Sequence, residues 1–398
     1  MGHGGAQVWP YLLGHYPPSS VPEERRERDA SAQAQYEATL SEWLAAEAMV
    51  RHREGAKLSS ESTTSEIPLI GPKDAHLSNE VFEDGSSDGG GSMEAATHDG
   101  GVDDEIAWEV DSSHSPAHTA GSDRPAAETW TAVPGGSQPE EGARPDPLQQ
   151  LLQPPAMDDE SSCVSPASSS GGVYSSDLLD LFSLNLHRID KDVQRCDRNY
   201  PYFTTTNLEK LRNVMCTYVW EHLDVGYVQG MCDLVAPLLV IFDDEMLTYS
   251  CFCELMKRMA ANFPHGGAMD HHFANMRSLI QILDGEMFEL MHQNGDYTHF
   301  YFCYRWFLLD FKRELVYQDV FSVWETIWAA QHVASGNFVL FIALAMVEYY
   351  RDIILENNMD FTDIIKFFNE MAERHDAKAV LQIARELVLQ IQTLIDNR

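Results

Sequence analysis

The chain has few basic residues for its length, and this scarcity excludes several kinds of partner. Its 398 residues include 27 Lys and Arg against 62 Asp and Glu, which gives a formal net charge of −35. Such a charge repels the phosphates of nucleic acids and the headgroups of anionic membranes. We therefore expect no nucleic-acid partner, and at most an indirect association with membranes.

Long apolar runs are also missing. The longest, 338–347, has ten residues, whereas a helix that spans a bilayer needs about 20. No secretion signal is visible at the start of the sequence, and Ala6 stands where a myristoylation motif requires Ser or Thr. These absences predict a cytoplasmic protein without a membrane anchor of its own.

Paired cysteines and metal-ligand spacings are absent as well. The seven cysteines are odd in number, form no Cys-x-x-Cys, and lie mostly in apolar, helix-like runs, which predicts buried thiols in a reducing compartment. His265, His271 and His272 stand near Asp270, but without a His-x-x-x-His spacing or a third ligand. We expect no metal site, and the lack of a phosphate-binding Gly-x-x-x-x-Gly-Lys-[Ser/Thr] loop predicts that the chain itself binds no nucleotide.

An acidic, polar segment separates two apolar parts of the chain. Positions 58 to 175 hold 22 Asp and Glu against three Lys and Arg, together with many Ser, Gly and Pro. A segment with low hydrophobicity and charge of one sign cannot bury enough apolar surface to offset its conformational entropy. We therefore expect residues 57–175 to be a disordered insertion between an N-terminal segment, 1–56, and a main domain, 176–398.

The two apolar parts show helical rather than strand periodicity. Apolar residues recur every three or four positions, and no run alternates β-branched with polar residues. The fold class predicted from this pattern is all-α. The helices are expected at about 20–55, 176–195, 206–220, 227–241, 246–261, 272–293, 299–310, 318–333, 337–356, 361–372 and 376–396.

Arg195 stands at the end of the predicted helix that contains Leu186-His-Arg-Ile-Asp-Lys-Asp-Val-Gln-Arg195. The planar guanidinium of arginine can bridge two phosphate oxygens and keeps its proton. An arginine supplied to a GTPase in this way speeds hydrolysis by roughly 10³–10⁵. The alternative is a surface ion pair with Asp192, three residues earlier, which would stabilise the helix by only about 0.2–0.5 kcal/mol. The helical pattern alone favours this second reading.

Gln229 follows 34 residues later, within Gly226-Tyr-Val-Gln-Gly-Met231. A glutamine side chain can hold a water molecule in line for attack on a phosphoryl group. Gly226 and Gly230 would permit close approach of the backbone to another surface, and Tyr227 would fix the direction of Gln229. Gln229 could equally cap the N-terminus of a helix, so its role stays open when it is considered alone.

Together, the two motifs are more specific than either. Ile-x-x-Asp-x-x-Arg at 189–195 and Tyr-x-Gln at 227–229, in this order and at this spacing, resemble the signature of TBC domains, which activate Rab-type small GTPases. Other parts of the chain that resemble the family are Trp9 within 8–14, the segment 211–218, Asp233, and the segments 306–315 and 323–325.

The resemblance implies a two-lobed, all-helical domain with a groove that receives a Rab-family GTPase in its GTP form. Arg195 and Gln229 would both act in trans, so the chain would be a GTPase activator without independent catalytic activity. It would need no cofactor, because GTP and Mg²⁺ belong to the partner. It would reach trafficking membranes peripherally, through the GTPase. The residues expected to support the two fingers are Asp192, Tyr227, Ile189, Gly230 and Trp9.

Two further expectations follow from the resemblance. The acidic segment and the sequence around Trp9 are most similar to the small G-protein signalling modulator subfamily. The family's opening motif has an arginine four residues before the tryptophan, where this chain has Gly5, so we expect a short form whose domain start is truncated. The alternative function is a non-catalytic effector or scaffold that uses the same groove to bind GTP-loaded Rab- or Rap-type GTPases.

Overall fold

The computed structural model describes residues 5–61, 147–153, 174–264, 266–293 and 300–397, with the side chains of 57–61 excepted. Across these ranges every regular element is a helix, so the all-α prediction is confirmed. None of the described helices has the length and apolarity that crossing a bilayer requires. Most of the predicted disordered insertion lies outside the described residues.

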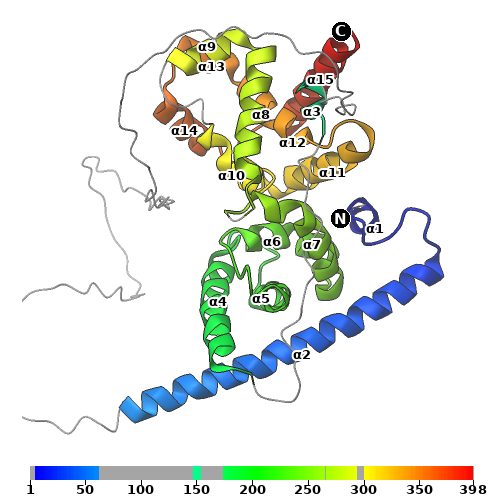
Figure 1. The fold of residues 1–398 in the computed structure, drawn as a ribbon, viewed down its shortest axis with the longest axis vertical. Coiled ribbons are helices and arrows are strands. Elements are labelled where there is room, and N and C mark those ends of the chain that lie inside the picture. The colour runs from blue at the N-terminus through cyan, green and yellow to red at the C-terminus, as the bar shows by residue number, and fades with distance from the viewer. Residues whose placement is uncertain (1–4, 62–146, 154–173, 265, 294–299, 398) are drawn as a thin grey trace, which may run out of the picture. The chain divides into compact units, whose positions relative to one another are not determined.

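A first group of helices packs on one long helix (Figure 1). The long helix α2 contacts α4, α5 and α7, and α5 contacts α6. Buried polar contacts fix this packing: Trp43 Nε1 donates to Thr217 Oγ1 at 2.9 Å, and Thr39 Oγ1 donates to Glu221 Oε1 at 2.9 Å. The helices of this group are α2 (Pro22–Glu61), α4 (Ser176–Arg195), α5 (Thr205–Glu221), α6 (Met231–Phe242) and α7 (Glu245–Met259).

The second group is built around the most apolar helix, α12 (Phe338–Tyr349), which is buried from Phe338 to Val347 and packs along α15 (Ala377–Asp396). A helix that is apolar on all sides is stable in water only when neighbours cover it, and α8 and α11 also contact α12. The other helices of this group are α8 (Ala268–Leu283), α9 (Gly285–Gln293), α10 (Tyr304–Leu308), α11 (Tyr317–Val333), α13 (Arg351–Glu356) and α14 (Phe361–Glu370).

The N-terminal helix α1 (Gly5–Leu12) joins the two groups by packing on α6 and α11. Trp9 is fully buried there, and its Nε1 donates to Glu325 Oε1 at 2.8 Å. Its ring meets Trp328 edge-on at 4.9 Å between centroids. A Cβ atom on Gly5 would lie 3.1 Å from Trp9 Nε1 and 3.5 Å from Glu325 Oε1. The position where the resemblance predicts an arginine is therefore closely packed in this chain.

Several predicted helix limits are wrong. The helix expected at 227–241 begins at Met231, so Gln229 lies in a turn. The helix expected at 272–293 breaks at Asp284, and the one expected at 337–356 breaks at Tyr350. Gly55 does not end α2, which continues to Glu61, because a glycine inside a helix costs only about 1 kcal/mol relative to alanine.

The segment assigned to the disordered insertion contains a folded piece that the sequence analysis missed. The short helix α3 (Pro147–Gln150) contacts α15, and Leu148 and Leu151 are buried in the core. The carbonyl oxygen of Leu152 accepts from the backbone N–H of Gly336 at 2.9 Å and from Ser335 Oγ at 3.1 Å. The prediction of disorder is therefore wrong for residues 147–153.

Candidate functional site

Helix α4 delivers Arg195 to the protein surface. Ser175 caps its N-terminus by accepting the N–H of Leu178 at 3.2 Å, and an apolar stripe that includes the fully buried Ile189 holds it against the core. Arg195 is the last helical residue, and its side chain is 44% exposed. The position at a helix end and this exposure leave the guanidinium accessible to a partner.

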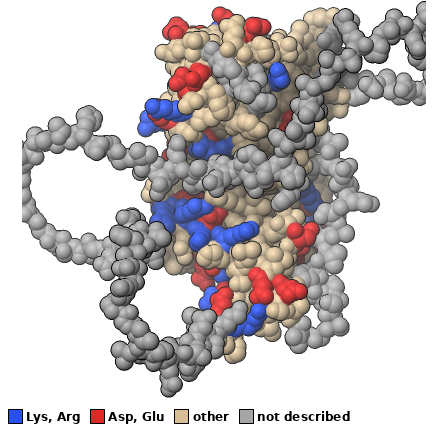
Figure 2. All heavy atoms as spheres, turned by 60° about the vertical axis from the view of Figure 1, so that its left-hand side comes forward, with Lys and Arg blue, Asp and Glu red and all other residues tan. Residues whose placement is uncertain are grey.

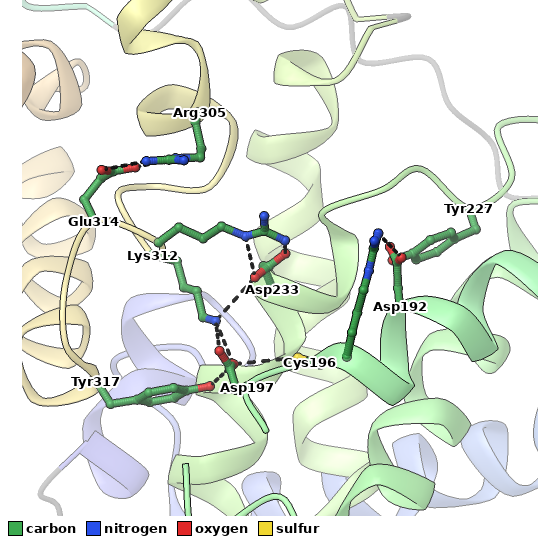
Figure 3. Close-up of polar contacts among 11 residues, drawn as sticks. Asp192, Cys196, Asp197, Tyr227, Asp233, Arg305, Lys312, Glu314 and Tyr317 are labelled. Atoms are coloured by element: carbon green, nitrogen blue, oxygen red, sulfur yellow. Dashed lines mark hydrogen bonds and ion pairs between the residues drawn. The ribbon is translucent and has the colours of Figure 1, made fainter. Parts of the chain in front are cut away.

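The carboxylate of Asp192 links the two motifs. One oxygen accepts from Arg195 Nη2 at 2.5 Å, and the other accepts from the Tyr227 hydroxyl at 2.6 Å. Figure 3 shows Tyr227 and Asp192 pointing toward one another, from the turn before α6 and from α4. Burial is the main cause that raises the pKa of Tyr227 well above its usual value, and the negative charge of Asp192 adds to it, so the hydroxyl remains a donor. The ion pair weighed in the sequence analysis is formed, and it is part of this larger contact.

The turn that carries Gln229 is fixed by two glycines in left-handed backbone. Gly226 has φ +70°, and a Cβ there would lie 2.8 Å from Asn185 Oδ1, the atom that accepts the N–H of Tyr227 at 2.7 Å. Gly230 has φ +103° and is the N-cap of α6. A non-glycine residue is strained at such angles. Gln229 is half-buried, and its side chain makes no hydrogen bond to a described residue, so its amide is available to an outside group.

Asn185 was missed by the sequence analysis. Its side chain is buried on the apolar side of α4, donates to the carbonyl of Leu181 at 2.9 Å, and accepts from the Tyr227 N–H. A buried amide stays in the folded state only when its hydrogen bonds are made. The available signal was a polar residue on the apolar face of an amphipathic helix.

The connection between α10 and α11 supports the site from the other side. Lys312 Nζ donates to both oxygens of Asp197 at 2.6 Å and to Asp233 Oδ1 at 3.3 Å, and Arg313 contacts Asp233 at 3.1 and 2.9 Å. Tyr317 also donates to Asp197, at 2.5 Å. Figure 3 shows Lys312 between the two carboxylates.

The ion pairs around Asp233 are charged despite their burial. Burial alone would raise the pKa of Asp233, but the charges of Lys312 and Arg313 outweigh it and hold that pKa below its usual value. Burial would likewise lower the pKa of Lys312, and the charges of Asp233 and Asp197 raise it above its usual value. Asp233 and Lys312 therefore both keep their charges at neutral pH.

Basic side chains gather near Arg195 although the chain as a whole is acidic. Figure 2 shows Lys and Arg clustered midway along the face that it displays, with acidic groups mostly above and below them. Along α4 and just beyond it, Arg188, Lys191, Arg195 and Arg198 are all exposed. A local concentration of positive charge attracts phosphate groups even where the net charge of the protein is negative.

The histidines weighed as metal ligands do not converge. His272 is buried, its Nε2 donates to Asn262 Oδ1 at 2.9 Å, and its ring stacks on Phe307. Burial lowers its pKa to about 4, so it is a neutral core residue. His265 lies outside the described residues, and in the described part no cluster of three or more potential metal-ligating side chains is found.

The chain contains a domain of the TBC family: the model of the Rab-GTPase-TBC domain matches residues 170–355. This range includes Arg195, Gln229 and the whole network around Lys312. This match agrees with the resemblance drawn from the two motifs.

Within this family, the chain is similar to the small G protein signaling modulators. In an alignment of 433 positions it is 52% identical to the mouse protein named Small G protein signaling modulator 2, covering 98% of this chain and 43% of that protein. It is 79% identical over 235 residues to human Small G protein signaling modulator 1, covering 59% of this chain and 20% of the relative. The Rab GTPase-activating protein tbc-8 of Caenorhabditis elegans is 52% identical over 223 residues, which are 55% of this chain and 24% of that protein. The chain thus spans less than half the length of these relatives.

Among solved structures, the chain is similar to the Ypt/Rab-GAP domain of Gyp1p. The identity is 18% and the TM-score is 0.48, with 62% of this chain and 79% of that chain covered.

Proposed function

We propose that this chain is a GTPase-activating protein that accelerates GTP hydrolysis by a Rab-family small GTPase, with Arg195 and Gln229 supplied in trans. The observation that carries the proposal is the bridge from Asp192 to both Arg195 and Tyr227. This bridge brings an exposed arginine and the turn of a half-buried glutamine to one place on the surface. The TBC-family domain and the names of relatives such as tbc-8 support the same function.

The chemistry fits these two side chains. In phosphoryl transfer, the protein contributes mainly positioning and charge stabilisation, because negative charge spreads over the phosphoryl oxygens in the transition state. Arg195 would neutralise this charge, and Gln229 would orient the attacking water. The nucleotide and its Mg²⁺ would belong to the GTPase, and the chain would reach trafficking membranes through that partner.

The ion pair itself supports one alternative. Arg195 is held by Asp192 at 2.5 Å, so it must leave or share this contact to reach a phosphate group. If it does not, the chain would bind a GTP-loaded Rab- or Rap-type GTPase as an effector or scaffold, without accelerating hydrolysis.

Single-turnover hydrolysis across a panel of GTP-loaded Rab proteins separates the two functions. We expect one Rab to be accelerated, and Arg195→Lys and Gln229→Ala each to remove most of the roughly 10³–10⁵-fold effect that a supplied arginine gives. Arg26→Ala is the matched control, since Arg26 on α2 is exposed and pairs with Glu23, three residues earlier, at 2.7 Å. GTP-dependent binding without acceleration by the wild-type chain would establish the effector instead.

A further inference from the structure

Lys312 is a buried cation between two segments that lead to the two fingers. Its side chain is only 4% exposed. Its ammonium group contacts Asp197 at 2.6 Å and Asp233 at 3.3 Å. Lys312 comes from a third segment, the connection between α10 and α11, and belongs to neither finger motif.

Asp197 fixes the path of the chain directly after Arg195. It lies two residues beyond the finger, in left-handed backbone with φ +42°, a conformation that costs a non-glycine residue free energy unless its surroundings hold it. The contacts that hold it come from Lys312 and from the Tyr317 hydroxyl at 2.5 Å. The direction in which α4 ends, and with it the position of Arg195, depends on these two contacts.

Asp233 fixes the path of the chain directly after Gln229. It stands in the first turn of α6, four residues after Gln229, and its N–H donates to the Gly230 carbonyl at 3.0 Å. Lys312 and Arg313 both bind its carboxylate. The start of α6, from which the glutamine turn projects, is thereby tied to the same ammonium group as the end of α4.

We propose that Lys312 is a positioning residue. Together with the Asp192–Tyr227 contact, it holds the segment of Arg195 and the segment of Gln229 in fixed positions relative to one another. This inference rests on the proposed function. The Asp192–Tyr227 contact lies within the last turn of α4, and the contacts of Lys312 lie just after it. These two independent contacts restrict movement of Arg195 relative to Gln229. A buried ion pair contributes little net stability compared with apolar residues of the same shape, so its effect is expected in geometry more than in folding.

The test compares Lys312→Met with Arg305→Met. Methionine keeps an unbranched apolar side chain in place of lysine while removing the charge. Arg305, in α10, pairs at 2.6 Å with the buried carboxylate of Glu314, which lies on the same connection as Lys312. Among the described residues, this pair makes no hydrogen bond to the segment of Arg195 or to that of Gln229. Both substitutions leave a buried carboxylate with one partner fewer, so both are expected to lower the melting temperature.

The kinetic readout is the split between kcat and KM for the Rab that the wild-type chain accelerates. We expect Lys312→Met to lower kcat by about 10- to 100-fold with KM nearly unchanged, because misplacement of catalytic groups by about 1 Å costs on the order of 10² in rate. Asp197→Asn should give a similar loss, and the double variant should lose little more, since both changes break one contact. Equal kcat losses in Lys312→Met and Arg305→Met would overturn the proposal.

Hydrogen exchange of the free chain provides a readout that does not depend on any GTPase. Lys312→Met should speed exchange in both 195–199 and 226–231, whereas Arg305→Met should leave these two segments as they are. If the wild-type chain accelerates no Rab, the proposed function fails. Hydrogen exchange alone then tests whether Lys312 holds the segments 195–199 and 226–231 together. Faster exchange in both segments upholds it, and unchanged exchange in either overturns it.

Discussion

The hydroxyl of Tyr227 donates to the carboxylate of Asp192 at 2.6 Å, across 35 positions of sequence. This contact joins the turn of Gln229 to the helix of Arg195. It also occupies one oxygen of Asp192 and leaves the other for Arg195. The carboxylate therefore fixes Arg195 and the turn of Gln229 relative to one another.

Removing the hydroxyl of Tyr227 should reduce activation of the GTPase much more than it reduces the stability of the fold. We predict that Tyr227→Phe lowers GTPase activation at least tenfold while costing about 0.5–1.5 kcal/mol of stability, the usual contribution of one hydrogen bond. The ring remains to fill the core, so the fold persists. Single-turnover hydrolysis and urea unfolding measure the two effects.

Tyr202→Phe is the control for that prediction. Its hydroxyl also donates to a carboxylate, Asp243, at 2.7 Å, but it is attached to neither finger motif. Activation should survive in Tyr202→Phe. Full activation in Tyr227→Phe would show that the contact with Asp192 does not position Gln229.

The N-terminal helix should contribute strongly to stability through Trp9. The side chain is fully buried against Phe321, Trp324 and Trp328. We predict that Trp9→Ala lowers the unfolding free energy by about 3–5 kcal/mol, the range found when large aromatic side chains are truncated in cores. Glu325→Gln should cost far less, because its amide oxygen can still accept from Trp9 Nε1. Urea unfolding of the two variants would contradict this if Trp9→Ala cost under about 1 kcal/mol.

The helices were predictable from the sequence where each has one apolar face, because the residues of that face are the ones buried in the core. The stripe on α4 that ends at Val193 shows this, because its apolar residues follow the helical period and lie in the core. The breaks at Asp284 and Tyr350 were not predicted, since the predicted helices ran across both positions. Asp284 accepts the N–H of Met287 at 3.0 Å at the start of α9, and it also has a distant partner. Arg351 Nε donates to Asp284 Oδ2 at 2.7 Å, and helical periodicity contains no information about a partner 67 residues away.

The candidate site was predictable in its two motifs, which include the supporting Asp192 and Tyr227, and not in the supports that come from distant parts of the chain. Arg195, Gln229 and Tyr227 could be singled out because their side-chain chemistry and spacing are local to two short segments. Lys312 could not be singled out, because its role depends on a fold that brings it to Asp197, 115 positions earlier in the sequence. A lysine in an apolar run was its one visible sign.

The docked segment 147–153 leads to a prediction about the insertion. Leu148 and Leu151 are buried against the core, and burying an unpaired carboxylate there would be costly. Leu148→Asp with Leu151→Asp should therefore release this segment and speed hydrogen exchange in α15 and at Gly336, whose N–H donates to the Leu152 carbonyl at 2.9 Å. Gln149→Asp, at an exposed position of the same helix, should have no such effect. Unchanged exchange in the double variant would show that the segment is not held by these two leucines.

A pair of carboxyl groups should make stability fall as the pH rises. Glu348, on α12, is half-buried beside Asp284 at the end of α8. Burial, and after it the negative charge of Asp284, raises the pKa of Glu348 to about 7. The pKa of Asp284 is held below its usual value, because hydrogen bonds from Arg351 and from the Met287 N–H outweigh burial. Glu348 therefore carries the shared proton, which it donates to Asp284.

The direction of the pH effect follows from this raised pKa. Between the ordinary pKa of 4.5 and about 7, the folded chain binds the proton of Glu348 more tightly than the unfolded chain does. The contribution of Glu348 is therefore most favourable below pH 4.5 and is lost as the pH rises to about 7. Glutamine is neutral at every pH and can still donate to Asp284, so Glu348→Gln should remove this loss.

Urea unfolding of the wild type and Glu348→Gln at pH 5.5 and pH 8 provides the measurement. We predict that the variant is more stable than the wild type at pH 8, and that the difference shrinks at pH 5.5, where the wild-type carboxyl is mostly protonated in the folded state. Glu356→Gln, at an exposed position of α13, controls for the loss of one negative charge and should show no such change with pH. A constant difference between Glu348→Gln and the wild type at both pH values would mean that Glu348 is ionised in the folded chain throughout this range, and that Asp284 does not share its proton.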